Sequence, residues 1–228
     1  MKNRIVSEAK IFGVNFFLVS AFLTLAVLAL SVLGGDLLDF YPTAFEVVFP
    51  LFAAIAAGEW GKTRADGNFD CIAAQSRSLF GWVFLRYAAA FGFVSLFALV
   101  AMAGASFTRY EMPLWEAFAL YLPPAFFLSS LCALLGLLCR QEHIAALVCG
   151  VLWLILLSTR SLLRLPGVEY GYLFIRFAGD PHHIWLWNKA LVTLAGLLLW
   201  GVIYRKCRRR GVKFGNHDKP KPTIEHAL

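Results

Sequence analysis

The chain has 228 residues, of which 60% are hydrophobic and only 15% are charged, and its mean hydropathy is +0.68. This composition exceeds the apolar content of an ordinary water-soluble domain and indicates an integral membrane protein. The formal net charge of +7 does not indicate a nucleic-acid partner, because the basic residues lie at the ends of apolar segments and in the C-terminal tail. An anionic lipid surface explains that placement.

The apolar residues form six segments, and crossing a hydrocarbon core takes about 20 helical residues. The expected spans are 11–33, 42–57, 79–103, 114–138, 144–157 with an extension to 163, and 184–204. The first is longer than the apolar region of a signal peptide and has no convincing small-residue cleavage site after it. We therefore expect an all-α protein with an amphipathic cytoplasmic segment at 1–10, a six-helix transmembrane domain at 11–204 and a basic, flexible tail at 205–228.

Lysine and arginine are concentrated in the two terminal segments and in every second connection between the expected spans. Cytoplasmic loops of membrane proteins are enriched in these residues. Those assigned to the cytoplasm are Lys2, Arg4, Lys10, Lys62, Arg64, Arg77, Arg140, Arg205, Lys206, Arg208, Arg209 and Arg210. This pattern predicts cytoplasmic termini and a multi-pass protein of a cell membrane, such as a bacterial inner membrane or a plasma membrane.

The connection at 158–183 departs from this pattern, because it is assigned to the outer side and yet contains Arg160, Arg164 and Arg176. Its arginines alternate with leucine, tyrosine and phenylalanine, a mixture typical of short helices that lie in the membrane interface or dip into it. We expect an interfacial or re-entrant outer hairpin here, with an ordinary irregular loop as the alternative.

The cysteines and histidines do not form a recognisable metal or disulfide motif. Five cysteines lie within the expected spans or on the cytoplasmic side, without a CxxC pair, so they are interpreted as reduced packing residues. His182 and His183 have no convergent cysteine or carboxylate partners in the sequence pattern, so no metal site is expected there. No cofactor is expected on this chain.

Ionisable residues and prolines inside the spans are the candidates for cavity and helix-bending roles. Glu46 lies one turn into the second span, with Pro50 one turn further, and is expected at the interface, with a polar cavity or a neighbouring helix as alternatives. Lys189 is expected to extend to the outer interface. Pro123 and Pro124 both lack an N–H group, so they predict a kink or break in the fourth span.

The sequence contains no motif for catalysis within the membrane or for ATP hydrolysis. It has no GxSxG, HExxH or GxxxxGK[ST] motif and no pair of intramembrane aspartates. Glu142 and His143 lie at a span boundary and are interpreted as a solvated helix start. The chain is therefore predicted not to be an enzyme.

The polar connection between the second and third spans is the strongest functional signal. Phe69, Ile72 and Ala73 repeat at helical spacing, which predicts a short amphipathic helix on the inner membrane surface. Its polar face would be free to contact a cytoplasmic partner. The residues assigned to this contact are Glu59, Gly61, Asp66, Phe69, Asp70, Ile72, Ser76 and Arg77.

This stretch resembles the membrane subunit of ABC-2-type ATP-binding-cassette exporters. The matching features are an acidic residue and a glycine after a span, a short helix, a Ser-Arg pair and a cationic residue inside the next span. They correspond here to Glu59, Gly61, Ser76, Arg77 and Arg86. The resemblance implies a permease that pairs with an identical or homologous permease subunit and with separate nucleotide-binding ATPase subunits, which would bind ATP and Mg²⁺.

The resemblance also implies the direction and mechanism of transport. ATP-driven closure of the ATPase subunits would move the second and third spans and export an amphipathic substrate, such as a peptide, a lipid or a drug-like molecule. Two alternatives remain, a haem-exporter-type permease and a membrane scaffold or sensor subunit that transports nothing.

Overall fold

The structure is a computed structural model that describes residues 2–33, 40–60, 79–107, 113–139, 141, 143–159, 161, 163, 167–179 and 184–215. Within these ranges it is all-helical and contains no strand, which confirms the all-α part of the predicted fold class. The long helices are α1 (Lys2–Leu33), α2 (Phe49–Trp60), α4 (Leu79–Ala105), α5 (Leu114–Leu138), α6 (Ile144–Ser158) and α7 (Trp185–Gly215). A π-helix, η2 (Pro42–Val48), leads directly into α2, and a 3₁₀ helix, η4 (Val168–Tyr170), precedes α7.

Among the described residues, five helical segments are long and apolar enough to cross a membrane. They are Phe16–Leu33, Pro42–Glu59, Leu79–Ala105, Leu114–Leu138 and Trp185–Arg208. The remaining helix, α6, has 15 residues. At 1.5 Å per residue it extends about 22 Å, which is less than the roughly 30 Å of a hydrocarbon core. The crossing expected for 144–157 therefore stays a prediction.

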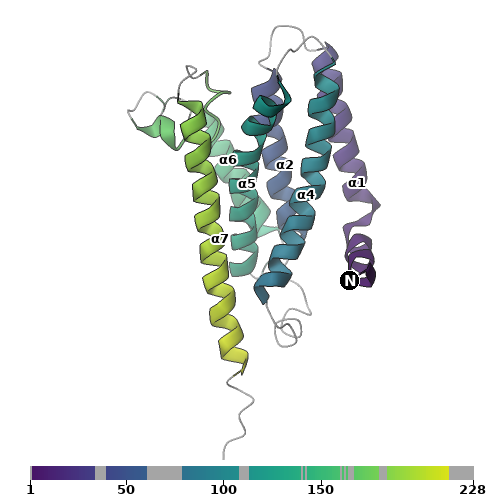
Figure 1. Ribbon diagram of the computed structural model, residues 1–228, viewed down its shortest axis with the longest axis vertical. Helices are drawn as coiled ribbons and strands as arrows, with labels where there is room; N and C mark the ends of the chain where they lie inside the picture. Colours follow the sequence, from purple (N-terminus) through teal and green to yellow (C-terminus); the bar gives the residue numbers. More distant parts are fainter. Residues whose placement is uncertain are drawn as a thin grey trace, which may run out of the picture.

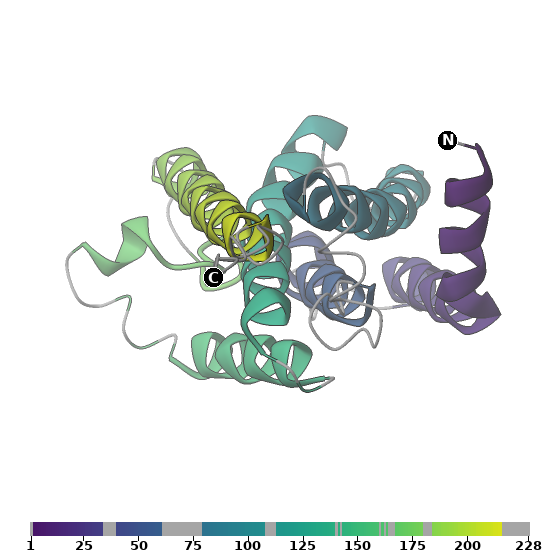
Figure 2. The same ribbon diagram turned by 90° about the horizontal axis from the view of Figure 1, so that it is seen from below.

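Successive long helices run in alternate directions (Figure 1). One end of the bundle contains the start of α1, the end of α2, the start of α4 and the end of α7. We call it the basic end, because Lys2, Arg4, Arg205 and Arg208 belong to it. The other end is called the opposite end. Viewed along the bundle, α2 and α5 lie in the middle, α1 lies at one edge beside α4, and α6 and α7 lie on the other side (Figure 2).

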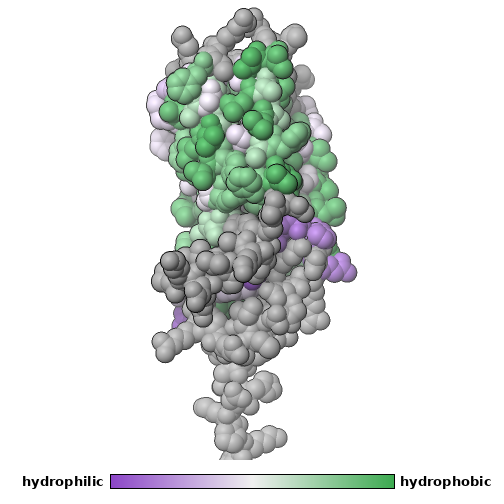
Figure 3. Space-filling view, turned by 90° about the vertical axis from the view of Figure 1, so that its right-hand side faces the viewer, coloured by the Kyte–Doolittle hydropathy of each residue, from purple (hydrophilic) through white to green (hydrophobic). Residues whose placement is uncertain are grey.

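The outer face of the bundle is apolar, as expected for a surface in contact with lipid. On α1, Phe22, Leu25 and Leu33 are 74%, 65% and 81% exposed. The α1 side of the molecule is correspondingly covered by hydrophobic residues over the part of the surface that is coloured (Figure 3). A contiguous apolar surface of this kind would be unfavourable in water, so it supports a membrane location.

The central helices approach closely because their facing residues are small. On α2, Ala53, Ala54, Ala56 and Ala57 are all buried. A Cβ atom added to Gly58 would lie 2.8 Å from the sulfur of Cys132 on α5. Small residues are the usual means of bringing helix backbones together in a membrane.

Helix α5 continues without interruption through Pro123 and Pro124, so the expected break does not occur, and the kink stays a prediction. Both prolines are buried. Each removes one backbone hydrogen bond, which frees the carbonyl groups of Ala119 and Leu120. Neighbouring helices can support such a helix in the interior of a membrane protein.

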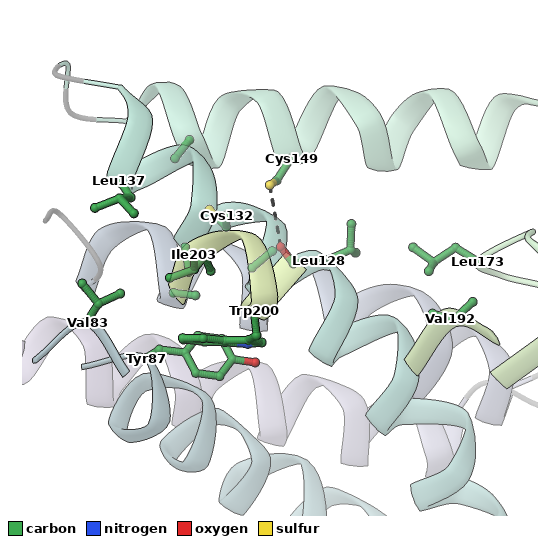
Figure 4. Packing of buried hydrophobic residues seen from close by; sticks show 14 of the residues in the cluster. Val83, Tyr87, Leu128, Cys132, Leu137, Cys149, Leu173, Val192, Trp200 and Ile203 are labelled. Atoms are coloured by element: carbon green, nitrogen blue, oxygen red, sulfur yellow. Dashed lines mark hydrogen bonds between the residues drawn. The ribbon is translucent and has the colours of Figure 1, made fainter. Parts of the chain in front are cut away.

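Hydrogen bonds between side chains hold α5 against its neighbours both before and after Pro123 and Pro124. Toward the opposite end, the Tyr121 hydroxyl lies 3.0 Å from that of Ser95 on α4. Toward the basic end, the Tyr87 hydroxyl of α4 lies 3.0 Å from Ser129, and Trp200 Nε1 of α7 donates to Ser130 at 3.0 Å. The rings of Tyr87 and Trp200 are in edge contact beside these hydrogen bonds (Figure 4).

Candidate functional site at a buried ion pair

An ion pair between Glu46 and Lys189 lies inside the bundle near the opposite end. The Glu46 side chain is fully buried and that of Lys189 is 4% exposed. Glu46 belongs to η2 and Lys189 to the second turn of α7, so the contact joins the second and last predicted spans. Two charges removed from water are tolerated only when they are paired and hydrogen-bonded.

This arrangement corrects two sequence-based expectations. Glu46 is not exposed to an interface but is buried against a neighbouring helix, which was one of the two alternatives. Lys189 does not extend outward, because its ammonium group reaches the Glu46 carboxylate inside the bundle. The sequence contains a signal for this pairing, since two opposite charges lie at similar distances from the ends of their expected spans.

The ion pair is completed by the backbone of the 167–179 segment. The N–H of Phe177 donates to Glu46 Oε2 at 2.7 Å and that of Arg176 donates to Oε1 at 3.3 Å. Lys189 Nζ donates to the carbonyl of Leu173 at 3.1 Å. Both charges therefore have partners that are fixed by the same turn-rich segment, and this segment covers the pair.

Asn188, the neighbour of Lys189, also attaches the 167–179 segment to α7. Its Nδ2 donates to the carbonyl groups of Glu169 and Tyr172, each at 2.8 Å. Between these contacts and the ion pair, Leu173 and Phe174 are buried against the bundle. In the described part of the 158–183 connection, residues 161, 163 and 168–170 are 3₁₀-helical and most of the others form turns, so the interfacial or re-entrant hairpin stays a prediction.

The π-helix explains how Glu46 comes to face α7. Its hydrogen bonds reach one residue further than in an α-helix, as in the bond from the N–H of Phe49 to the carbonyl of Ala44. Pro50 has no N–H, so the carbonyl of Glu46 cannot accept the usual α-helical bond. The carbonyl of Val47 accepts a hydrogen bond of 2.9 Å from Trp153 Nε1 on α6. Pro50 thus lies beside a widened turn, and such turns are frequent at functional sites.

A second ionisable pair lies at the basic end. Glu59 Oε1 and His143 Nδ1 are 2.6 Å apart, with the side chains 38% and 66% exposed. Glu59 is in the last turn of α2, and His143 adopts a left-handed backbone conformation (φ 66°) immediately before α6. The pair therefore links the end of α2 to the start of α6. His143, which the sequence-based interpretation treated as part of a solvated helix start, contacts Glu59 specifically.

Most residues assigned to ATPase contact lie outside the described residues. These are Gly61, Asp66, Phe69, Asp70, Ile72, Ser76 and Arg77. His182, His183 and Cys71 also lie outside them. The described cysteines Cys132, Cys139, Cys149 and Cys207 are free thiols, and no group of three or more potential metal ligands occurs among the described residues.

The site defines a class of protein only coarsely: a helical membrane protein with a charged contact buried between two of its candidate spans. Comparison with protein-family models, with curated proteins and with solved structures finds no match.

Proposed function

We propose that this chain is the permease subunit of an ATP-driven exporter that resembles the ABC-2 type. In this proposal six helices, α6 included, form the transmembrane domain, both termini are cytoplasmic, and two permease subunits form the transport route. Separate ATPase subunits hydrolyse ATP, and an amphipathic substrate moves outward.

The attachment of α2 at both ends is the observation that best supports this proposal. At the opposite end, η2 and α2 are held through Glu46 to α7 and to the 167–179 segment. At the basic end, α2 leads into the 61–78 connection and α4 begins directly after it. A force applied to that connection acts on α2 and α4 with few intervening residues.

A displacement of α2 would reach the outer side through contacts that are already in place. The closely packed α2 and α5 form a continuous core, and such cores move between discrete arrangements rather than deforming gradually. Movement of α2 along or across the bundle would therefore change the geometry at Glu46. That change would shift the 167–179 segment that covers the outer end, which is the step an exporter requires.

The proposal is tested by purifying the chain from its native membrane and measuring the ATPase activity that co-purifies. Phe69→Ala and Arg77→Ala are expected to reduce both the co-purified ATPase protein and its activity. The matched controls are Phe107→Ala, at a 91% exposed position at the opposite end, and Arg208→Ala at the basic end of α7. The controls are expected to retain both properties.

Equal ATPase recovery from the two pairs of variants would contradict the proposed contact. Absence of any co-purifying ATPase from the unmodified protein would contradict the exporter itself and favour a scaffold or sensor subunit. Chromatographic homogeneity of each variant in detergent is measured alongside, so that loss of folding is separated from loss of contact.

A further inference from the structure

A cavity of about 350 Å³ lies between α5, α6, α7 and the 167–179 segment. Its wall contains Phe127 of α5, Leu152 and Leu156 of α6, and Val192 and Ala195 of α7, and Leu173 closes one side. Leu173 and Val192 belong to the same cluster of buried hydrophobic residues and lie next to each other in it (Figure 4). The volume falls near the lower limit of small-ligand pockets, which is roughly 300 Å³.

The short α6 explains why space remains here. Leu152 and Leu156 are in its last two turns, and the helix ends at Ser158. At about 22 Å this helix is shorter than the roughly 30 Å of a hydrocarbon core. The neighbouring part of α7 and the 167–179 segment line the cavity beside the end of α6.

The cavity opens toward the surface that faces lipid. Two of its lining residues, Tyr170 and Leu191, are 43% and 44% exposed. The outward side of α6 beside it is apolar, with Leu154 and Ile155 at 56% and 52% exposed. Tyr170 places a phenol near this opening, and tyrosine favours the boundary between hydrocarbon and headgroups.

We propose that this cavity binds one acyl chain of a bilayer lipid, with the headgroup near Tyr170 and the chain directed toward Phe127. A mostly apolar cavity of this kind offers water few hydrogen-bond partners, while leaving it empty loses dispersion contacts with its walls. The bilayer supplies a flexible hydrocarbon chain at the opening. The inference does not depend on the export function.

The bound chain would contact the residue that joins the cavity to the ion pair. Leu173 lines the cavity with its side chain, and its carbonyl accepts the hydrogen bond from Lys189 Nζ. An occupied cavity therefore supports the position of the 167–179 segment, and emptying it removes packing from beneath the same backbone that covers Glu46.

The test uses the full-length protein in vesicles of phosphatidylglycerol and phosphatidylethanolamine without nucleotide. A trace of phosphatidylglycerol carries a diazirine near the end of one acyl chain, and the labelled residues are identified by mass spectrometry after illumination. Labelling at Phe127 and Leu152 is expected to exceed that at the lipid-facing Leu147 and Leu198 about tenfold, the ratio given by a preference of about 1.4 kcal/mol. Because the vesicles contain only phospholipid, such labelling identifies bilayer lipid as the source of the chain.

Ala195→Trp fills the cavity and is expected to lower labelling at Phe127 about tenfold, again equivalent to about 1.4 kcal/mol. Leu198→Trp is the matched control on the same helix, because Leu198 is 65% exposed, and it is expected to leave the labelling of Phe127 unchanged. Uniform labelling of cavity and lipid-facing residues in the unmodified protein would overturn the proposal. This outcome requires no variant, so the test remains decisive even if Ala195→Trp fails to fold.

Discussion

The two ends of α2 carry acidic residues in contrasting environments. Glu46 at the opposite end is fully buried, and its partners are a buried lysine and two backbone N–H groups. Glu59 at the basic end is 38% exposed and contacts a His143 side chain that is 66% exposed. The first contact is made in the interior, where charges cannot separate without a large cost. The second is accessible to water, which stabilises both partners when they separate.

This difference indicates which end of the helix is held and which is free to respond. The opposite end has several hydrogen bonds to one covering segment, so a movement there must be concerted. The basic end of α2 precedes the 61–78 connection. It is joined to α6 by the contact between Glu59 and His143, whose partners are accessible to water. In the proposed exporter, movement would begin at the basic end and be transmitted to the opposite end.

Replacing Glu46 by alanine is expected to have the largest effect, because it leaves the Lys189 charge buried without its carboxylate. The free energy of unfolding should fall by about 3–5 kcal/mol. The measurement is unfolding by steric trapping in detergent micelles.

The double variant Glu46→Leu, Lys189→Met is the matched control, because it removes both charges and retains side chains of similar size. Its loss of stability should be smaller than that of Glu46→Ala, because only the backbone groups of Leu173, Arg176 and Phe177 lose their partners and no unpaired charge is buried. If Glu46→Ala destabilises the protein no more than Glu59→Ala does, the contrast between the two ends is wrong.

A methyl group at Gly58 tests the packing of α2 near the basic end. The added Cβ would lie 2.8 Å from Cys132 Sγ and 3.2 Å from Ala146 Cβ, so α2 must move relative to α5 or α6. Overpacking of this kind should cost about 1–3 kcal/mol in the free energy of unfolding.

Gly104→Ala on α4 is the comparison for this glycine. Its Cβ would meet the end of the Leu28 side chain at 2.5 Å, and that side chain can rotate away. Alanine also gains up to about 1 kcal/mol over glycine within a helix. Near-neutral stability is expected by steric trapping, and an equal loss for both variants would show that the ability of the contacted side chain to move does not decide the cost.

Trp153→Phe removes the N–H group that donates to the carbonyl of Val47 while keeping an aromatic ring in α6. Stability should fall by about 0.5–1.5 kcal/mol, the usual net contribution of one hydrogen bond. Trp115→Phe is the control, since Trp115 is 61% exposed and its substitution should change thermal unfolding in detergent very little. A loss as large as that of Glu46→Ala would show that Trp153 has a role beyond this bond.

Glu59→Gln is expected to have the smallest effect on folding, about 0–1 kcal/mol, because both partners of the contact are substantially exposed. The same thermal unfolding measurement applies, with Glu116→Gln in the first turn of α5 as a control. Breaking a buried ion pair costs at least about 3 kcal/mol. A loss of that size for Glu59→Gln would show that the Glu59 contact behaves like the buried contact of Glu46.

Composition and hydrophobic length by themselves determined the membrane class, the all-helical fold and the approximate limits of the long helices. They do so because a chain in hydrocarbon must satisfy its backbone hydrogen bonds within each segment, so long apolar runs form helices. The start of α4 at Leu79 and both limits of α5 agree with the segments read from the sequence.

Only the tertiary structure decided how the polar residues within these helices are used. Single-span reasoning placed Lys189 at the interface because a long side chain can extend outward, and it could not identify Glu46 as its partner 143 residues away. The continuity of α5 through Pro123 and Pro124 likewise depends on support from other helices. The physical reason is common to both: the cost of a buried charge or a lost backbone bond depends on which partners the fold brings within hydrogen-bonding distance.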